Sequence, residues 1–444
     1  MDYDVAIIGA GSAGLFASLV LSEEGLRVVV LDRGLAPKER ESIVYGVGGA
    51  GTFSDGKLNL TTKIGGDPAS IGCSEDELLR LIAQVDDTFT RCGAPMNYSG
   101  EDSDALGRLY QSAAQAGIEF IAGRQRHIGT SRIREVIDAL YHDLIERGIE
   151  FRLDCRVETI EEVDGGFRVG IAGGDVTARH VIAAPGRSGA YWLREVTRGL
   201  GVGPEFGPLD VGVRIEFPAE IYEPIESIMY DAKLRVRTTT YDDMVRTFCT
   251  NPRGFVVRED SDDFALVNGH AENKRKSKNT NFALLVHVEL TDPVEDTTQY
   301  GRAIAELATT IGGGRPILQR LKDLQQGRRS TAERIRRVRI SPTLGDYTPG
   351  DVSMALPQRI VVDLLESIER LDRILPGLAS DGTLIYAPEI KFYDTRYNVG
   401  TGMETALPGF YVAGDASGHS RGIVFAAVTG ILAARKIAAG ATAS

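Results

Sequence analysis

The sequence predicts an α/β protein in which a discontinuous Rossmann-like domain is interrupted by an inserted α+β domain. Two short segments near opposite ends carry this prediction. Residues 4–14 (DVAIIGAGSAG) have the pattern of a buried strand, a glycine-rich turn and the start of a helix, and residues 406–418 (ALPGFYVAGDASG) contain a second buried strand followed by a Gly-Asp turn. Between them, from about residue 210 to residue 377, alternating strands and longer helices predict the inserted domain.

The glycines of the first segment fit the dinucleotide-binding fingerprint, G-x-G-x-x-G. Gly9 allows the tight turn after the strand, Gly11 lets the backbone approach a pyrophosphate, and Gly14 lets the helix pack closely on the strand. We expect a helix from about residue 12 to residue 24, with its N-terminus facing the phosphates. Asp32 ends the next strand, where its carboxylate can accept hydrogen bonds from ribose hydroxyls. The fingerprint alone does not distinguish NAD from FAD.

The Gly-Asp turn of the second segment, Gly414-Asp415, favours FAD. The two ends of the chain resemble those of the two-dinucleotide-binding-domain flavoproteins, in which such a turn places its carboxylate on the ribityl chain that NAD lacks. The resemblance therefore implies FAD as the cofactor. The residues expected to contact it are Gly9, Gly11, Ser12, Ala13, Gly14, Asp32, Arg33, Gly48, Gly49, Val157, Ala184, Gly186, Gly414, Asp415, Gly422 and Ile423.

The composition disfavours several classes of function. The chain has 444 residues, with 62 acidic against 50 basic side chains and a net charge of −12, which argues against nucleic acid and anionic membrane surfaces as partners. The four cysteines and six histidines are dispersed without CxxC or HExxH spacing, so we expect neither a disulfide-reductase centre nor a metal site. Because a strand is expected from residue 3, we expect no signal peptide and a cytoplasmic protein with reduced thiols.

Helical periodicity predicts helices over residues 74–92 and 103–117. Thr130 or Ser131 is expected to N-cap a further helix. The longest apolar stretch, residues 422–434, is too short to cross a bilayer. It predicts the last helix of the Rossmann-like domain, and no integral membrane segment is expected.

These elements divide the chain into five segments. Three of them would form the FAD-binding domain, one a helical cap, and one the substrate domain. The expected boundaries are 1–60 for the first part of the FAD-binding domain, 61–125 for the cap, 126–205 for the second part of the FAD-binding domain, 206–382 for the substrate domain and 383–444 for the third part of the FAD-binding domain.

Six internal segments together resemble the family of uncharacterised FAD-dependent dehydrogenases. More distantly, the chain resembles flavin ene-reductases and geranylgeranyl-reductase-type enzymes. The resemblance covers most of the chain and implies a glutathione-reductase-like FAD fold. The segments are GGAGTFSDGKL (48–58), HIGTSRI (127–133), APGRSGAYWL (184–193), FCTNPRGFVV (248–257), VNGH (267–270) and GDASGHSRGI (414–423).

The chain departs from the family pattern at two places. Around Cys249 the family pattern is Cys-x-Cys-Pro-Gly-Gly, but here Asn251 replaces the second cysteine and Arg253 the first glycine. After Gly418 the family tends to have Tyr-Ala-Gly-Gly-Ile, where this chain has His-Ser-Arg-Gly-Ile. Both departures lie where a substrate could sit. They argue against two-thiol chemistry and leave a family-typical substrate in question.

Five residues are candidates for catalysis: Lys57, His419, Arg421, Cys249 and His270. Lys57 follows a glycine-rich loop that the resemblance places near the flavin, where a cation could orient an anionic substrate. Arg421 could clamp a carboxylate or phosphate, and His419 could transfer a proton near neutral pH. Each of the five also has a structural alternative, such as a buried thiol, a helix cap or a surface ion pair.

The leading functional hypothesis is an FAD-dependent oxidoreductase that transfers a hydride between flavin and a small organic substrate, which could be anionic. It would reduce an activated C=C or C=N bond or run the reverse dehydrogenation. Electrons would come from transiently bound NAD(P)H, from the substrate or from a protein donor. Two alternatives stay open: a flavin monooxygenase, although Pro185 stands where hydroxylases need an aspartate, and a non-catalytic binding protein on the FAD fold.

Overall fold

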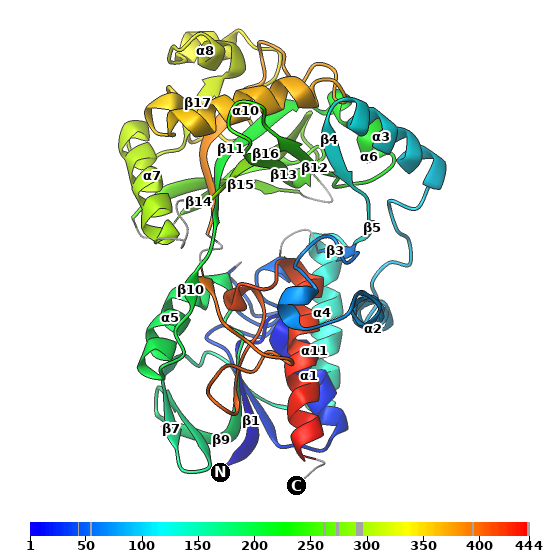
Figure 1. Ribbon diagram of the computed structural model, residues 1–444, viewed down its shortest axis with the longest axis vertical. Helices are drawn as coiled ribbons and strands as arrows, with labels where there is room; N and C mark the ends of the chain where they lie inside the picture. Colours follow the sequence, from blue (N-terminus) through cyan, green and yellow to red (C-terminus); the bar gives the residue numbers. More distant parts are fainter. Residues whose placement is uncertain are drawn as a thin grey trace. The chain divides into compact units, whose positions relative to one another are not determined.

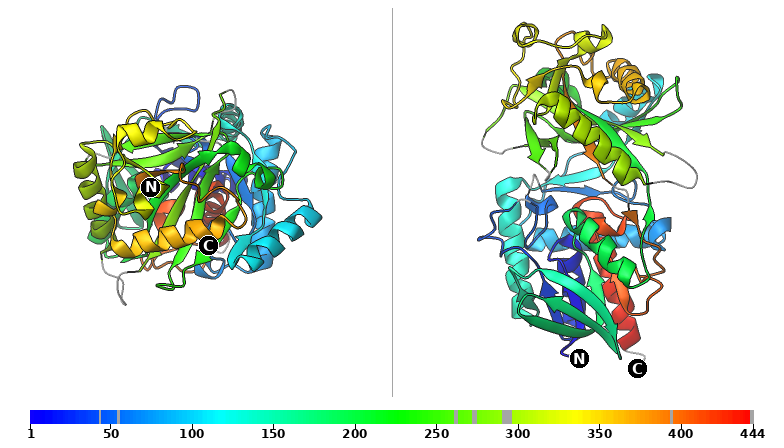
Figure 2. Two further views of the ribbon diagram at one scale, coloured as in Figure 1. Left: turned by 90° about the horizontal axis from the view of Figure 1, so that it is seen from above. Right: turned by 90° about the vertical axis from the view of Figure 1, so that its left-hand side faces the viewer.

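The structure is a computed structural model that describes residues 1–441 except 43, 54–55, 261–262, 272–274, 290–295 and 393–394. The chain divides into two compact units, each built from separate stretches of sequence (Figures 1 and 2). The first unit comprises residues 1–98, 123–205 and 395–444, and the second comprises residues 99–122 and 206–394.

The first unit is built on a sheet with the strand order β6-β2-β1-β9-β8-β7, and β21 also pairs with β9. Strands β6, β2, β1, β9 and β21 are parallel, whereas β7, β8 and β9 form an antiparallel meander. The expected α/β class and Rossmann-like topology are therefore confirmed. The strands are β1 (Tyr3–Ile8), β2 (Val28–Leu31), β6 (Glu150–Arg152), β7 (Val157–Val163), β8 (Gly166–Ile171), β9 (Gly174–Ala183) and β21 (Phe410–Val412).

Three helices pack together on the first unit, and the views of Figure 1 and Figure 2 show them side by side: α1 (Ser12–Glu23), α4 (Thr130–Glu146) and α11 (Gly422–Ala441). Most residues of α1 and α11 are buried, because the sheet, neighbouring helices and loops surround them. The expected N-cap of α4 was wrong. Gly129 occupies that position with a φ of +84°, and glycine has no side chain that could cap the helix.

Helix α11 is longer than the apolar stretch from which it was predicted, since it continues through Arg435 and Lys436 to Ala441. Within the described residues, it is the one helix that is long and apolar enough to cross a membrane, and 78% of the relevant window is buried. Burial of that extent is typical of the core helix of a folded domain.

The remaining elements of the first unit are short or peripheral. Helix α2 has the capping residue that its sequence suggests, because the Ser74 side chain accepts a hydrogen bond from the backbone N–H of Glu77. These elements are β3 (Lys57–Leu60), α2 (Glu75–Arg91), β5 (Arg124–His127), α5 (Ala190–Gly199) and β20 (Thr395–Arg396), and β10 (Glu205–Phe206) lies where the chain passes to the second unit.

Glycines let helices α1 and α11 approach each other and β1 without side chains between them. A Cβ added at Gly430 would lie 2.0 Å from the carbonyl oxygen of Ala13. A Cβ at Gly14 would lie 2.0 Å from the carbonyl oxygen of Gly9. Real Cβ atoms do not come this close to backbone oxygens, so each position requires glycine.

We expect Gly430→Ala to lower the free energy of unfolding by about 1–3 kcal/mol or more, because the methyl group would push α11 away from α1. Gly440→Ala is the matched control in the same helix, since its Cβ would meet nothing within 4 Å. It should be neutral or stabilise by up to about 1 kcal/mol. Urea denaturation of both variants measures the difference. Equal stabilities would contradict the close packing.

The second unit is built on a sheet that is mostly antiparallel, with the order β18-β17-β19-β11-β16-β13-β12-β4. A hairpin of β14 and β15 adds a separate pair of strands. The strands are β4 (Ile118–Ile121), β11 (Leu209–Pro218), β12 (Lys233–Arg237), β13 (Met244–Asn251), β14 (Phe255–Asp260), β15 (Ala265–His270), β16 (Asn279–Val288), β17 (Ile317–Arg320), β18 (Thr348–Pro349) and β19 (Leu384–Lys391).

Alternation along β11 separates the two faces of this sheet. Val211, Val213 and Ile215 belong to the apolar core that helices α10 and α7 cover. Asp210, Arg214 and Glu216 alternate with them and are also buried. The helices of the second unit are α3 (Ser103–Gln115), α6 (Glu223–Glu226), α7 (Thr297–Gly312), α8 (Leu321–Gln325), α9 (Ala332–Arg336) and α10 (Gln358–Leu371).

The units differ from the expected domain boundaries at two places. The expected cap, residues 61–125, is not a separate unit: residues 61–98 and 123–125 belong to the first unit, and residues 99–122 belong to the second, where β4 pairs with β12. Residues 383–394 were expected in the FAD-binding domain, but β19 lies between β17 and β11 in the second sheet. Both departures arise from strand pairing between residues far apart in the sequence.

Candidate functional site

The glycine-rich turn after β1 lies at the carboxyl end of the parallel strands of the first unit, where open α/β sheets bind ligands. Gly9 has a φ of +103°, and its Cβ would lie 2.2 Å from the carbonyl oxygen of Ala184 after β9. The backbone N–H of Gly48 donates to the carbonyl oxygen of Ala10 (2.8 Å). These contacts bring the expected cofactor segments around residues 9–14, 48–49 and 184 together.

Asp32 lies at the end of β2, where its carboxylate holds the turn after β1 in place. One oxygen accepts a hydrogen bond from the backbone N–H of Ala10 (2.8 Å), and the other accepts one from the N–H of Gly34 (2.8 Å). A carboxylate has about four acceptor positions, so the side chain can still accept hydrogen bonds from ribose hydroxyls. The role expected of Asp32 is therefore compatible with its structural one.

Two other residues expected to contact the cofactor, Arg33 and Val157, lie near Asp32. The backbone N–H of Cys155 donates to the carbonyl oxygen of Asp32 (2.9 Å), so the start of β7 at Val157 follows a segment held against β2. The Arg33 guanidinium donates to Ser188 (2.9 Å) and lies over the ring of Tyr45 at 4.3 Å. Segments 33–34, 154–157 and 186–188 thus border the same region.

The Gly-Asp turn lies beside the first helix. Gly414 has a φ of +70°, its Cβ would lie 3.2 Å from the Cβ of Ala13, and its N–H donates to the Thr429 hydroxyl (2.8 Å). Asp415 accepts a hydrogen bond from the Ser420 hydroxyl (3.0 Å) and lies 3.7 Å from the Arg187 guanidinium. Its side chain is 18% exposed, so it can still bind a hydroxyl of a ligand.

Space beside the backbone is left open at the glycines where a dinucleotide would lie. A Cβ at Gly186 or Gly422 would meet nothing within 4 Å, and a Cβ at Gly11 would meet only the Cα of Gly49, at 3.8 Å. Gly422 begins α11, whose first N–H groups carry a partial positive charge, and Ile423 is buried next to it. An open backbone, a helix N-terminus and two acidic side chains fit the pyrophosphate and hydroxyl groups of FAD.

We expect Gly11→Ala to weaken FAD binding at least tenfold while changing the melting temperature of the apoprotein by no more than a few degrees. Gly11 has a φ of −74°, which any residue can adopt, but its Cβ would occupy the space left for the pyrophosphate. Fluorescence titration of the apoprotein with FAD measures the affinity. Gly107→Ala, also in open space, is the control and should bind FAD as the wild type does. Unchanged affinity in Gly11→Ala would place the cofactor elsewhere.

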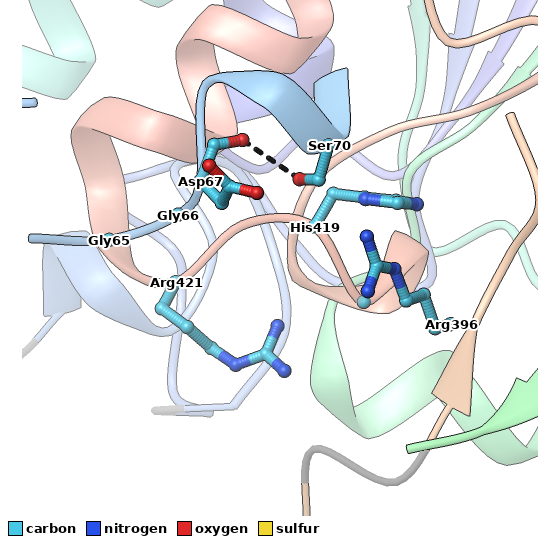
Figure 3. Close-up of a pocket in the computed structure, with 8 residues that line it drawn as sticks. Gly65, Gly66, Asp67, Ser70, Arg396, His419 and Arg421 are labelled. Atoms are coloured by element: carbon cyan, nitrogen blue, oxygen red, sulfur yellow. Dashed lines mark hydrogen bonds between the residues drawn. The ribbon is translucent and has the colours of Figure 1, made fainter. Parts of the chain in front are cut away.

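We call the turn at residues 9–14, Asp32, the Gly414-Asp415 turn and Gly422 the cofactor cradle. A pocket of about 220 Å³ lies beside this cradle, within the first unit (Figure 3). It is lined by Gly65, Gly66, Asp67, Ser70, Arg396, Gly418, His419 and Arg421. The structure thus brings the two expected catalytic residues of the 418–423 turn into one pocket. Asp67, Ser70 and the two glycines were not identified from the sequence, although the run GGDP after a strand is a turn signal.

The pocket is closed on one side by backbone contact. The N–H of Arg421 donates to the carbonyl oxygen of Gly65 (2.5 Å), and a Cβ at Gly66 would lie 2.4 Å from the ring of Phe425. The Arg421 side chain donates to the carbonyl oxygen of Ser420 (2.6 Å) and is partly exposed. Only glycines at 65 and 66 allow the loop to lie against α11.

His419 is buried, with 6% of its surface exposed, and its two ring nitrogens differ. Nε2 lies 2.7 Å from the carbonyl oxygen of Tyr397, which can only accept, so Nε2 carries the hydrogen. Nδ1 is then an acceptor, and it has no hydrogen-bond partner among the described residues. Burial lowers the pKa of His419 below its ordinary value, so the ring is neutral at pH 7.

The lowered pKa of His419 makes stability depend on pH. An unfolded histidine titrates near 6.5, so below about pH 6.5 the unfolded chain binds a proton that the folded protein does not. The free energy of unfolding contributed by His419 therefore falls as the pH drops, down to the folded pKa. We expect the wild type to lose more stability than His419→Gln between pH 7.5 and pH 5, as measured by thermal denaturation. Parallel curves would contradict a buried neutral ring.

The other candidate residues do not line this pocket. Lys57 begins β3, opposite His127 of β5, and Ser54 and Asp55 before it lie outside the described residues. Cys249 and His270 belong to the second unit, at β13 and the end of β15. The thiol of Cys249 is partly buried, and the residue has a φ of +48°. A catalytic role for these three residues stays a prediction.

Within the described residues, no group of three or more His, Cys, Asp or Glu side chains is placed to hold a metal ion. The acidic and basic groups of the second unit instead pair with each other. Arg214 and Glu389 are fully buried at 2.7 Å, and Lys391 lies 2.9 Å from the same carboxylate. Burial alone would raise the pKa of Glu389, but these two cations lower it.

Comparison with known families supports the assignment of the cofactor. Residues 2–63 match the family described as FAD binding domain, and residues 208–391 match the family described as FAD-dependent protein, C-terminal domain-like. The first match covers β1, α1 and β2. The second covers most of the second unit.

Individual relatives are more distant. An uncharacterised protein of Clostridium beijerinckii is 26% identical over 97% of this chain and 80% of its own length. The thiamine thiazole synthase of Pyrobaculum aerophilum is 31% identical over 28% of this chain and 38% of that enzyme. Among solved structures, glycine oxidase from Geobacillus kaustophilus (TM-score 0.41, 13% identity, 98% of this chain and 94% of that one) and halogenase PltM (TM-score 0.42, 14% identity, 100% and 70%) are similar. Values this low say nothing about activity.

Proposed function

We propose that this chain, which matches FAD-binding and FAD-dependent families over residues 2–63 and 208–391, transfers a hydride between FAD and a small organic substrate. The reaction would reduce an activated C=C or C=N bond, or oxidise the corresponding saturated bond. One observation carries the proposal. The segment from Gly414 to Ile423 contributes Asp415 and Gly422 to the cofactor cradle, and His419 and Arg421 to the neighbouring pocket.

FAD would supply the hydride chemistry, and the protein would bind, orient and exchange protons. The N-terminus of α11 favours negative charge in whatever lies against it. We assign the role of a neutral base to His419, whose Nδ1 has no hydrogen-bond partner among the described residues, and the binding of an anionic group of the substrate to Arg421. These roles require the neutral ring that burial favours.

The sequence has no second G-x-G-x-x-G fingerprint that opens a βαβ unit, so we propose that any nicotinamide donor binds only transiently. The purified FAD-loaded protein should be mixed without oxygen with NADH and with NADPH, and the flavin absorbance followed. Rapid bleaching by either is the expected result, with an unsaturated substrate then restoring the colour.

If neither NADH nor NADPH bleaches the bound flavin, its electrons would have to come from direct oxidation of a substrate or from a protein donor. A protein that purifies without flavin and does not bind it would contradict the proposed function. Consumption of one oxygen per product, with oxygen incorporated into that product, would identify a monooxygenase instead. Product analysis under ¹⁸O₂ distinguishes these results.

A further inference from the structure

Carboxyl groups of helix α10 hold the turn between β12 and β13, residues 238–243, against the helix. Glu366 accepts hydrogen bonds from the backbone N–H and the hydroxyl of Thr239 (2.5 and 2.8 Å). It also accepts from the backbone N–H and the hydroxyl of Thr240 (3.2 and 3.0 Å). Asp363 lies one helical turn earlier on α10 and binds the beginning of the same turn.

Asp363 lies beside a second carboxyl group, that of Asp243 at the end of the turn. The Thr238 hydroxyl donates to Oδ1 of Asp363 (2.8 Å) and accepts from the backbone N–H of Asp243 (3.1 Å). The carboxyl groups of Asp243 and Asp363 are within hydrogen-bond reach of each other. Two ionised carboxylates repel each other at such a distance, so the contact is attractive only when one of them carries a proton.

The surroundings decide which of the two carboxyl groups carries the proton. The Arg359 guanidinium donates to both oxygens of Asp243 (2.5 and 2.7 Å), which favours the charge on Asp243. Asp363 is fully buried, and no donor among the described residues reaches its Oδ2. The hydroxyl of Ser367, one turn further along α10, has no partner there either, so it does not donate to Oδ2. A proton on Oδ2 can be donated to Asp243 and removes this deficit.

The other groups around this pair leave the proton on Asp363. The strands that meet α10 face it with side chains of the apolar core, such as Val213, Val245 and Leu284. Burial, together with the neighbouring charge of Asp243, raises the pKa of Asp363 to about 6. The remaining titratable groups nearby have partners of their own: Glu366 with Arg370 (2.7 Å), Arg237 with Asp242 (3.5 Å), and Tyr241, whose ring lies under the Arg359 guanidinium (5.0 Å).

We propose that Asp363 and Asp243 form a pH-dependent latch, in which protonated Asp363 donates a hydrogen bond to ionised Asp243 and holds the 238–243 turn on α10. Loss of the proton leaves a second negative charge, buried beside the first, and favours opening of the turn. The latch lies in the second unit and contains no residue of the cofactor cradle or of the neighbouring pocket. The inference therefore goes beyond the proposed function and can fail without it.

The direction of the pH effect follows from the proton. When the turn opens, water reaches Asp363, and its pKa falls toward about 3.9, the value of an exposed aspartate. Because the pKa of Asp363 is about 6 when the turn is closed, the closed state binds more protons than the open state between about pH 4 and pH 6. Opening therefore becomes easier as the pH rises through this range. Between pH 5 and pH 8 the opening equilibrium should increase about tenfold.

Hydrogen exchange of the purified protein, measured by mass spectrometry on peptides that cover residues 238–243, reports this opening. Each rate is divided by that of the free peptide at the same pH, because exchange is itself catalysed by hydroxide. We expect the wild type to lose about tenfold in protection between pH 5 and pH 8. Asp363→Asn should show no such loss, since its amide N–H can donate to Asp243 at every pH while its oxygen accepts from Thr238.

Glu366→Gln is the matched control, because it changes another carboxylate of α10 that holds the same turn. Although burial opposes it, the hydrogen bonds from Thr239 and Thr240 lower the pKa of Glu366 to about 2, below the range of the experiment. This variant should be less protected at every pH but keep the tenfold change. If Asp363→Asn does not fold, Asp243→Asn replaces it, since an amide at that position can donate to ionised Asp363 and should also remove the pH dependence.

Constant protection of the wild type between pH 5 and pH 8 would overturn the latch. A tenfold loss that persists in Asp363→Asn, or in Asp243→Asn where that variant replaces it, would also overturn it, because the titrating group would then lie elsewhere. Loss of the pH dependence in Glu366→Gln would do the same, since the effect would not be specific to the pair.

Discussion

The close approach of backbone segments around Ala13 is the constraint on which the rest of the first unit depends. Gly430 lies against the carbonyl oxygen of Ala13, Gly414 lies against its side chain, and Gly14 lies against Gly9. Each contact is made by a glycine, so the helix–helix and helix–strand distances are set by backbone atoms, and the helix–turn distance by the Cβ of Ala13. Asp32 then fixes the turn by accepting from Ala10. A cofactor cradle made in this way is rigid before any ligand binds, which reduces the entropy lost on binding.

Much of the first unit was predictable because its signals are local. Gly9, Gly11, Gly14 and Asp32 each follow from the short-range geometry of a strand, a turn and a helix, and the structure places them where that geometry requires. The boundary of the second unit at residue 206 was predicted, but its inclusion of residues 99–122 and 383–394 was not, since β4 and β19 join its sheet through pairing with residues far away in sequence. A strand looks the same in sequence whichever sheet it joins.

The pocket was only half predictable for a similar reason. His419 and Arg421 stand beside the Gly-Asp turn, so the motif drew attention to them. Asp67 and Ser70 come from a loop whose place depends on Gly65 and Gly66 lying against α11, and no motif marks that contact. Nδ1 of His419 is an acceptor because Nε2 donates to the backbone carbonyl oxygen of Tyr397. Since every residue has a backbone carbonyl, the residue types do not predict this bond.

The contact between α1 and α11 also has a consequence for biosynthesis. The ribosome makes α1 early in the described chain and α11 only after both parts of the second unit. During most of translation, α1 therefore cannot pack against α11. The part of its apolar surface that α11 covers stays exposed during that time. Folds completed by such distant contacts form slowly and expose aggregation-prone surface. Shielding of the nascent first unit, by a chaperone or by early FAD, would therefore raise the yield of folded protein.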